Sequence, residues 1–350
     1  MSIRNLIEKI EEKGLVGRGG ACFPVAFKWR SVRDSQVNTK YVVCNAAEGE
    51  PGVFKDGYIL EDHADRVVDG INLAMDLLKA DLAYIYISRP YYNEYYDIIK
   101  NKFNHYPIEF FIKPHEAGYI GGEETSILNI IEGKRAEPRL RPPFPPDSGL
   151  WGCPTLIHNV ETFYNISLVN DGKFQGHRFY SINQDCYYPG VYELSSDLTI
   201  EKVLKKTGNY PEYNFFVQVG GDASGEVLND KQLKKKVSGA GSITVYKADK
   251  YKPRKLLEDW LDFFLRESCG KCTPCREGIY RAKEILNAPK PDWTLFYELV
   301  HNLNVTSFCG LGCAASFPLN SYIKNVLGAG YSPHREISRK EVDQICHCFK

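Results

Sequence analysis

The sequence of 350 residues has no excess charge of either sign, because 44 basic residues balance 44 acidic ones. A neutral chain has no overall field to attract a polyanion, so no nucleic acid is expected as a partner. No stretch approaches ~18 uninterrupted apolar residues, the length that a membrane-spanning helix needs, so direct membrane insertion is not expected. The first residues, MSIRNLIEKIEEKGL, are charged and amphipathic and do not resemble a signal peptide. These absences predict a cytoplasmic globular protein.

Cysteine is scarce for a disulfide scaffold, and its eleven copies are unevenly placed. Seven of the eleven lie at or after position 269. Clustered cysteines in a cytosolic chain bind a metal or an iron–sulfur cluster more often than they form disulfides, because thiols there are kept reduced. The C-terminal region is therefore predicted to hold a cofactor. The last two, Cys346 and Cys348, have no further ligands beside them and are expected to lie in a disordered or exposed tail.

Hydrophobic patterns divide the chain into three predicted domains. Runs of β-branched and aromatic residues predict strands at 41–46 and 82–88, and helical spacing between them at 57–80 indicates an α/β unit with a parallel strand pair. Shorter strands and one helix from about 178 to 247 indicate a small α+β domain. Four apolar-striped segments of helical period follow Pro253 and predict a helical bundle. The predicted domains are 1–175, 178–250 and 254–345.

Three closely spaced cysteines, Cys269, Cys272 and Cys275, form the pattern C-x2-C-x2-C, and Cys309 follows 34 residues later. Three thiolates from one loop can occupy three corners of a cubane, which a distant fourth closes, so the spacing predicts a [4Fe–4S] cluster. Zinc is the main alternative, although its structural sites usually use two paired C-x2-C motifs, and free structural thiols are a third. Cys313 is an alternative fourth ligand if its segment is helical.

A glycine-rich loop and two acidic loops are candidate ligand sites. Gly17–Gly20 (GRGG) follows an amphipathic helix, and its backbone N–H groups and the Arg18 charge could bind phosphate, although such a motif alone is often a bare turn. Asn45, Glu48 and Glu50 follow a predicted strand, and the sequence GGEE at 121–124 begins a helix-like run. Loops at the carboxyl ends of strands bind ligands in α/β sheets. Carboxylates there can accept from ribose hydroxyls, and solvated loop charges are the alternative.

Several long stretches together resemble one family, the flavin-bearing, NADH-oxidising subunit of bacterial respiratory complex I, with its relatives in NAD-linked hydrogenases and formate dehydrogenases. The fold that this resemblance implies is an α/β flavin-binding domain, a small α+β domain similar to a β-grasp, and an all-α bundle carrying the iron–sulfur cluster. The matching stretches are GLVGRGGACFPVAFKW (14–29), CNAAEGEPGVFKD (44–56), the segment 119–155, NVETF (159–163), ESCGKCTPCREG and SFCGLG.

The resemblance also implies which residues hold the cofactors. Those implied to surround FMN are Gly17, Gly19, Lys28, Asn45, Glu48, Gly122, Glu123 and Asn159. Those implied to bind NADH are Phe23, Glu50, Glu124, Arg141 and Phe144, with the aromatic rings facing the bases and the acids facing ribose or nicotinamide. The predicted cofactor site also includes Arg18, Gly20, Tyr119 and His158. Phe23 and Phe144 could instead be buried core residues.

Four positions depart from the family pattern. Ala47 stands where the family usually has aspartate, so one polar contact beside the flavin is missing. Cys22 and Ala26 replace glycines, and His158 replaces the first asparagine of N-N-V-E-T. Replacing glycine by a larger residue near a cofactor can narrow the pocket.

The predicted function is an electron-entry subunit of an NADH dehydrogenase type, which passes hydride from NADH to FMN and single electrons onward to the [4Fe–4S] cluster. The chemistry belongs to the cofactors, so no catalytic acid or base is predicted. The implied partners are other electron-transfer subunits, namely a small thioredoxin-like [2Fe–2S] protein and a larger iron–sulfur or catalytic subunit. Alternatives are the same module in a hydrogenase, formate dehydrogenase or bifurcating complex that reduces NAD(P), a scaffold subunit that has lost flavin, and a zinc-binding interaction module.

Overall fold

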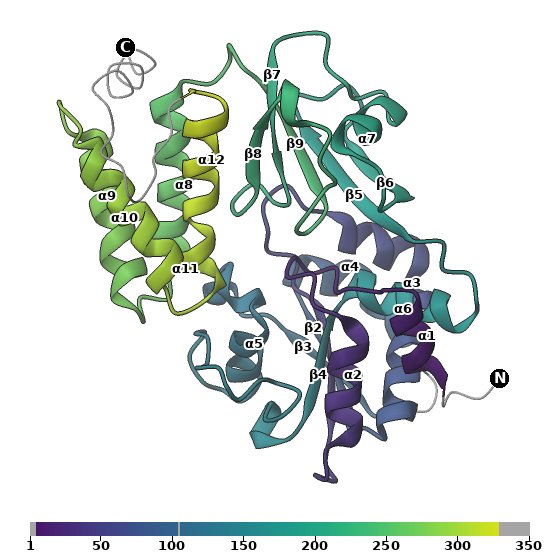
Figure 1. Ribbon diagram of the computed structural model, residues 1–350. Helices are drawn as coiled ribbons and strands as arrows, with labels where there is room; N and C mark the ends of the chain where they lie inside the picture. The colour runs from purple at the N-terminus through teal and green to yellow at the C-terminus, as the bar shows by residue number, and fades with distance from the viewer. Residues whose placement is uncertain (1–4, 104–105, 329–350) are drawn as a thin grey trace. The chain divides into compact units, whose positions relative to one another are not determined.

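The computed structural model describes residues 5–103 and 106–328, which form two compact units (Figure 1). The first unit contains the described residues up to Gly49, those of Val53–Tyr180, and Glu193–Ser196. The second contains Glu50–Gly52, Ser181–Tyr192 and the described residues from Asp197 onward. The division into three domains stays a prediction.

The first unit is built on a parallel four-stranded sheet in the order β3-β2-β1-β4. The predicted strands 41–46 and 82–88 are confirmed as β1 and β2, and they pair in parallel as expected, with Tyr41 opposite Leu82. The strands β3 and β4 were not predicted, because each is only five residues long. The bounds are Tyr41–Ala46 for β1, Leu82–Ile87 for β2, Ile108–Ile112 for β3 and Thr155–Asn159 for β4.

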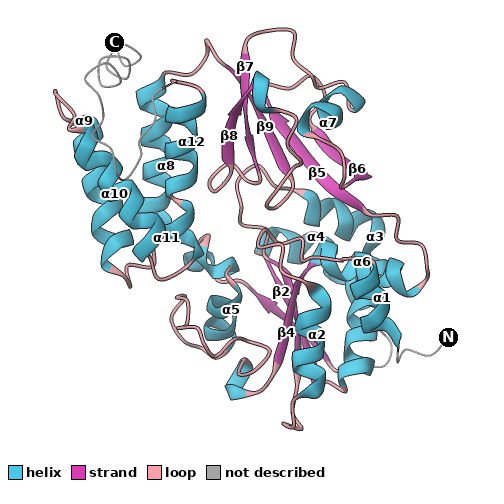
Figure 2. Cartoon of the chain, viewed as in Figure 1, coloured by secondary structure: helices cyan, strands magenta, loops and turns pink. Residues whose placement is uncertain are grey.

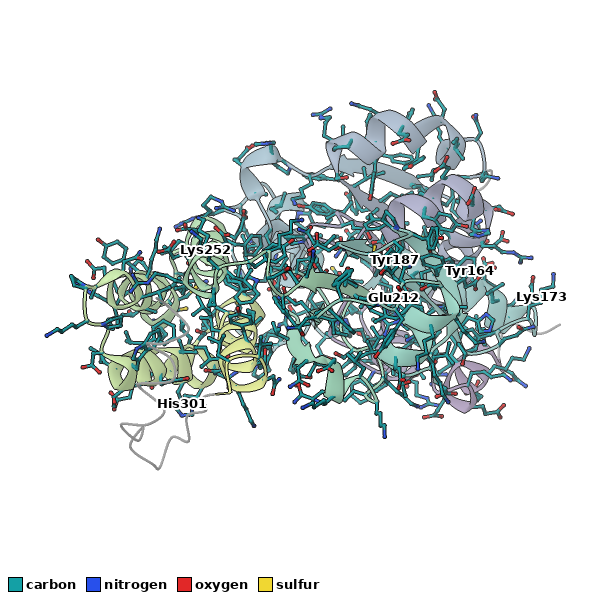
Figure 3. The ribbon with its side chains drawn as sticks, turned by 90° about the horizontal axis from the view of Figure 1, so that it is seen from above. Tyr164, Lys173, Tyr187, Glu212, Lys252 and His301 are labelled. Atoms are coloured by element: carbon teal, nitrogen blue, oxygen red, sulfur yellow. The ribbon has the colours of Figure 1, made fainter. Side chains whose placement is uncertain are left out.

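Helices accompany this sheet, as parallel strands require. The helix predicted between β1 and β2 is confirmed as α3, and it packs closely on α6 because a Cβ on Gly70 would lie 2.1 Å from the carbonyl oxygen of Phe163. Lys173, just after α6, extends outward with 62% of its side chain exposed (Figure 3). The helices are α1 (Leu6–Glu12), α2 (Val25–Asp34), α3 (Lys55–Leu78), α4 (Arg89–Lys100), α5 (Glu124–Ile131) and α6 (Val160–Asn170), with short 3-10 helices at His115–Ala117, Ile120–Gly122 and Leu150–Gly152.

The second unit contains a mixed five-stranded sheet in the order β6-β5-β9-β7-β8 (Figure 2). Strand β5 runs parallel to β9, whereas β7 is antiparallel to both β8 and β9. The mixture of parallel and antiparallel pairs with one α-helix agrees with the predicted α+β texture. The bounds are His177–Gln184 for β5, Gly190–Ser195 for β6, Phe215–Val219 for β7, Glu226–Asn229 for β8, Ser242–Lys247 for β9, Ile200–Lys206 for α7 and Asp230–Gln232 for a 3-10 helix.

The C-terminal part of the second unit is helical, which confirms the prediction from the apolar stripes. Cys275 lies in a π-helical turn at Pro274–Gly278, and the next helix begins directly after this turn. Among the described helices, none combines the length and the apolar character that crossing a bilayer requires. Cys346 and Cys348 lie outside the described residues. The helices are α8 (Pro253–Glu267), α9 (Ile279–Asn287), α10 (Trp293–Thr306), α11 (Gly310–Ala314) and α12 (Ser316–Asn325).

Candidate cofactor sites

The chain order in the parallel sheet reverses between β1 and β4, and the loops that follow these two strands lie at their carboxyl ends. Such a switch point is where open α/β sheets bind ligands. Asn45 lies near the carboxyl end of β1, Glu48 follows in the loop after it, and Asn159 ends β4. The topology therefore places predicted cofactor residues from distant parts of the sequence at one edge of the sheet.

Four of the predicted flavin residues converge at this edge. The Asn45 side-chain amide donates to the carbonyl oxygen of Gly122 at 3.0 Å, and the Asn159 amide donates to the Asn45 carbonyl at 3.4 Å. A Cβ on Gly19 would lie 3.3 Å from the Cβ of Asn159, so the glycine loop passes directly over this asparagine. A side chain at position 19 would therefore require Asn159 to shift by a few tenths of an ångström.

The glycine-rich loop holds a buried cation with an unsatisfied nitrogen. Arg18 is only 7% exposed, and its Nε has no hydrogen-bond partner among the described residues, the Glu161 carboxylate lying 3.9 Å away. Burial lowers the pKa of Arg18, while Glu161 opposes that shift. A buried guanidinium without a full set of partners favours an anion, so this loop fits the phosphate of a flavin mononucleotide. Gly17 donates its N–H to the Phe23 carbonyl at 2.8 Å, and Gly20 has the left-handed φ of +116° that glycine allows.

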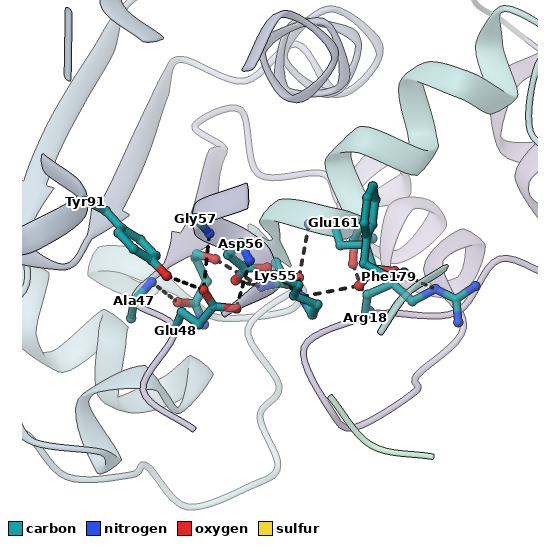
Figure 4. A network of polar contacts seen from close by, with 12 residues as sticks. Arg18, Ala47, Glu48, Lys55, Asp56, Gly57, Tyr91, Glu161 and Phe179 are labelled. Atoms are coloured by element: carbon teal, nitrogen blue, oxygen red, sulfur yellow. Dashed lines mark hydrogen bonds and ion pairs between the residues drawn. The ribbon is translucent and has the colours of Figure 1, made fainter. Parts of the chain in front are cut away.

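Next to the glycine loop lies a buried ionic network that was not recognised in the sequence (Figure 4). The Lys55 ammonium, 1% exposed, lies 2.5 Å from an Asp56 carboxylate oxygen, 2.9 Å from the Asn159 side-chain oxygen and 3.3 Å from Glu161. Burial alone would lower the pKa of Lys55, but the carboxylates of Asp56, Glu161 and Glu48 outweigh burial and raise it. The network joins the start of α3 to the start of α6.

Glu48 is held at the other end of this network. One carboxylate oxygen accepts from the backbone N–H of Asp56 at 2.8 Å, and the other accepts from Gly57 at 3.2 Å and from the Tyr91 hydroxyl at 2.5 Å. Burial, followed by the nearby charge of Asp56, raises the pKa of Glu48 to about 7. Its backbone adopts a left-handed φ of +32°, which is strained for a residue other than glycine.

Three of the predicted NADH residues, Phe23, Glu124 and Arg141, lie together with the predicted FMN residues Lys28 and Glu123. The Lys28 ammonium lies 2.6 Å from Glu124 and 5.8 Å from the centre of the Phe23 ring. Arg141 pairs with Glu123 and lies 3.3 Å from Glu124. Two carboxylates and two cations beside an exposed aromatic ring can offer ionic and stacking contacts to a dinucleotide.

Both predicted aromatic residues are exposed, so the alternative that they are core side chains is not supported. Phe23 is 43% exposed and Phe144 is 48% exposed.

The predicted flavin residue Glu123 also caps α5, since its carboxylate accepts from the N–H groups of Thr125 and Ser126.

Three predicted residues have other surroundings. Glu50 belongs to the second unit, where its carboxylate accepts from the N–H groups of Ala223 at 3.0 Å and Ser224 at 3.1 Å. His158 is buried, and its Nε2 accepts from the Trp29 indole at 3.0 Å, so burial lowers its pKa well below the usual value. Tyr119 is half-buried at the start of a 3-10 helix, beside Gly49.

The positions that depart from the family pattern are accommodated differently. Ala47 is 3% exposed and packs in an apolar cluster with residues that include Val43 and Ile127. Ala26 is 5% exposed on α2, whereas Cys22 is exposed and has a left-handed φ of +52°. The methyl group of Ala47 therefore faces the core.

The four cysteines predicted as cluster ligands come from two loops of the second unit. Burial, together with the nearby thiols of Cys272, Cys309 and Cys269, raises the pKa of the Cys275 thiol to about 12. The other three predicted ligands are thus within electrostatic range of Cys275, and Cys313 is within range of Cys272. Cys313 was an alternative fourth ligand if its segment is helical, and it does lie inside the short helix α11. Its thiol, however, donates to the Ser307 carbonyl at 3.8 Å.

Four cysteine thiols are the donor set that [4Fe–4S] clusters use. No group of three or more His, Cys, Asp or Glu side chains within residues 5–103 and 106–328 is arranged to hold one metal ion. Three of the four thiols are partly exposed and Cys275 is buried.

Comparison with known proteins gives two family matches. The Nuo51 FMN-binding domain matches residues 10–168, and the NADH-ubiquinone oxidoreductase-F iron-sulfur binding region matches residues 255–326. The NADH-quinone oxidoreductase F subunit of Streptomyces coelicolor is 30% identical over 366 residues, which cover 93% of this chain and 82% of that protein. The corresponding protein of Aquifex aeolicus is also 30% identical, covering 90% of this chain and 82% of the relative.

Hydrogenase subunits are similar as well. The NAD-reducing hydrogenase HoxS subunit alpha of Cupriavidus necator is 33% identical, covering 90% of this chain and 58% of that protein. A solved chain of an NAD+-reducing [NiFe]-hydrogenase in the H2-reduced state superposes with a TM-score of 0.85 at 27% identity. The match covers 93% of this chain but only 62% of the hydrogenase chain.

Proposed function

The chain belongs to the family of NADH-quinone oxidoreductase F subunits, and we propose that the loops after β1 and β4 are where it binds FMN and NADH. Its function is electron entry in a flavin and iron–sulfur oxidoreductase. When bound, FMN accepts a hydride and releases its electrons singly, which the [4Fe–4S] cluster receives. The observation that carries the proposal is the convergence of Gly19, Asn45, Gly122 and Asn159 at the switch point.

Each group of residues has a separate task in this proposal. The glycine loop and the buried Arg18 guanidinium bind the flavin phosphate in this proposal, because the Arg18 Nε has no hydrogen-bond partner among the described residues. Asn45 and Asn159 orient the ring system through their amides. Glu124, which pairs with the predicted flavin residue Lys28, holds the nicotinamide nucleotide, and the exposed rings of Phe23 and Phe144 stack on its bases.

The thiolates of Cys269, Cys272, Cys275 and Cys309 hold the cluster in this proposal. The charge effects of Cys272, Cys309 and Cys269 on Cys275 support this set, and the effect of Cys272 on Cys313 keeps Cys313 as the alternative fourth ligand. The partner subunits proposed are a small thioredoxin-like [2Fe–2S] protein and a larger iron–sulfur or catalytic subunit. A cytoplasmic location also stays a prediction.

The test is a visible spectrum of the full chain after anaerobic reconstitution with FMN, iron and sulfide. Resolved flavin bands that bleach on addition of NADH are expected, together with about four iron atoms per chain. The Cys309→Ser variant is the matched control, because it should lose iron and keep flavin that NADH still bleaches. A chain that binds iron and never binds FMN would overturn the electron-entry proposal and support the scaffold hypothesis.

A further inference from the structure

Tyr91 contacts the buried network of Figure 4 through a hydrogen bond to Glu48, one of the predicted flavin residues. The network contains the carboxylates of Glu48, Asp56 and Glu161, whereas Lys55 and Arg18 are its cations. Lys55 contacts two of these carboxylates directly. Within the described part of the chain Glu48 makes no direct ion pair, and its ionised form is favoured by the nearby Lys55 charge and by hydrogen-bond donors.

Those donors are two backbone N–H groups and one side chain. The backbone donors belong to Asp56 and Gly57 in the first turn of α3, where the helix dipole also favours a negative charge. The side-chain donor is the hydroxyl of Tyr91 on α4, which makes the shortest of the three contacts at 2.5 Å. Of the three donors, the Tyr91 hydroxyl is therefore the one that a substitution can delete without altering the backbone.

The contact between Tyr91 and Glu48 matters because few other side-chain contacts fix the backbone of the segment 45–48. At its start, Asn45 bridges to Gly122 and accepts from the Ala47 N–H at 3.1 Å. Ala47 supplies no side-chain hydrogen bond, because alanine has no polar side-chain atom, and its methyl group packs in the apolar cluster. Glu48 then adopts a strained left-handed φ of +32°, a conformation that persists only when surrounding contacts fix it.

We propose that Tyr91 is a positioning residue of the flavin site, which fixes Glu48 and the loop 45–48 in the conformation that binds FMN and keeps the carboxylate ionised beside it. The inference rests on the proposed function, since it concerns the same site. It goes beyond that function by assigning a role to a residue of α4, outside the motif stretches that resemble the family. The groups facing Glu48 are Lys55 and Asp56 from α3 and Tyr91 from α4.

The experiment compares Tyr91→Phe with Tyr95→Phe in the full chain reconstituted with FMN. Tyr95 lies one turn further along α4, and its hydroxyl pairs with Glu94, so the two variants remove the same atom from the same helix. Because a hydrogen bond to a charged group is worth about 1.5 kcal/mol or more, Tyr91→Phe should raise the Kd for FMN about tenfold. Its flavin midpoint potential should shift upward, since a carboxylate that loses a donor is more readily neutralised. Tyr95→Phe should leave both quantities unchanged.

A double-mutant cycle with Glu48→Gln separates positioning from general stability. In the Glu48→Gln background, Tyr91→Phe should produce no further shift of the midpoint potential, because the charge that Tyr91 supports is already gone. An equal shift in both backgrounds, or unchanged Kd and potential in the single variant, overturns the inference while the wild-type chain still binds FMN. A wild-type chain that binds no FMN overturns the proposed function, and the inference with it.

Discussion

Removing the Lys55 ammonium should be the most damaging change of a single charge in the first unit. The substitution Lys55→Met keeps a long flexible side chain and deletes the cation. In the structure that cation lies 2.5 Å from Asp56, 2.9 Å from Asn159 and 3.3 Å from Glu161, and all the carboxylates concerned are buried. The variant would therefore leave two buried carboxylates, Asp56 and Glu161, without their shared partner.

The size of the loss follows from the burial. Breaking a buried ion pair by removing one partner costs about 3–5 kcal/mol, because the remaining charge stays desolvated. Folded domains have only about 5–15 kcal/mol of unfolding free energy, so the variant should lose a large part of it. An exposed ion pair contributes little, because water and salt screen it. Lys205, which pairs with Glu201 on the surface of α7, provides the matched control as Lys205→Met.

The loss should depend on pH in a defined direction. The pKa of Asp56 is raised in the folded chain, mainly by burial, and Lys55 is the first of the groups that oppose this. Without Lys55 the pKa of Asp56 should rise further. A carboxyl whose pKa is higher in the folded state binds its proton more tightly there, so stability falls as pH rises from the unfolded value of about 4 through the folded value. The deficit of Lys55→Met should therefore be smaller at pH 5.5 than at pH 8.

The assay is urea unfolding of the wild-type chain, Lys55→Met and Lys205→Met, followed by circular dichroism at both pH values. At pH 8, Lys55→Met should lose about 3–5 kcal/mol of unfolding free energy, and Lys205→Met should unfold almost as the wild-type chain does. If the two variants lose the same amount, or if the Lys55→Met deficit grows on acidification, the electrostatic reasoning about this network is refuted.

Three further predictions concern the cofactor sites and the departure at Ala47. Cys309→Ala should lose most cluster iron while Cys313→Ala keeps it, and iron analysis showing the reverse would make Cys313 the fourth ligand. Glu124→Gln should raise the Kd for NADH tenfold or more with FMN still bound, since it removes a charged hydrogen-bond acceptor worth about 1.5–3 kcal/mol; an unchanged Kd would contradict its role. Ala47→Asp should cost about 1–3 kcal/mol in urea unfolding by placing a carboxylate in the apolar cluster, whereas an unchanged midpoint would show that the side chain turns outward.

The elements with strong local patterns could be predicted from the sequence. The runs that became β1 and β2 are β-branched and aromatic, and the segment that became α3 has helical spacing over about six turns, so type and order were correct. The short strand β4 has the sequence TLIHN, whose polar residues hide its burial on both faces. To predict β4 one must know that it pairs with β1, and the residues of β1 lie more than 100 positions earlier in the sequence.

The candidate site shows the same limit. The glycine loop and the acidic loops were found because their composition is unusual, and the structure brings Gly19, Asn45 and Asn159 together. Lys55 and Asp56 were missed because adjacent opposite charges normally indicate an exposed surface. His158 was expected near a cofactor, but it accepts a hydrogen bond from Trp29 in the core, a contact 129 positions apart that no local pattern encodes.

The path of the chain between the two compact units limits how this protein can be divided. The acidic loop leaves the first unit at Glu50 and re-enters it at Val53, and the three residues between them belong to the second. In that short excursion Glu50 accepts from Ala223 and Ser224, and Pro51 accepts from Asp222 at 3.0 Å. A fragment cut after residue 180 would retain the excursion and lose every one of these partners. Recombination at a single peptide bond near residue 180 would therefore separate Glu50–Gly52 from these partners and disturb the loop that carries Glu48.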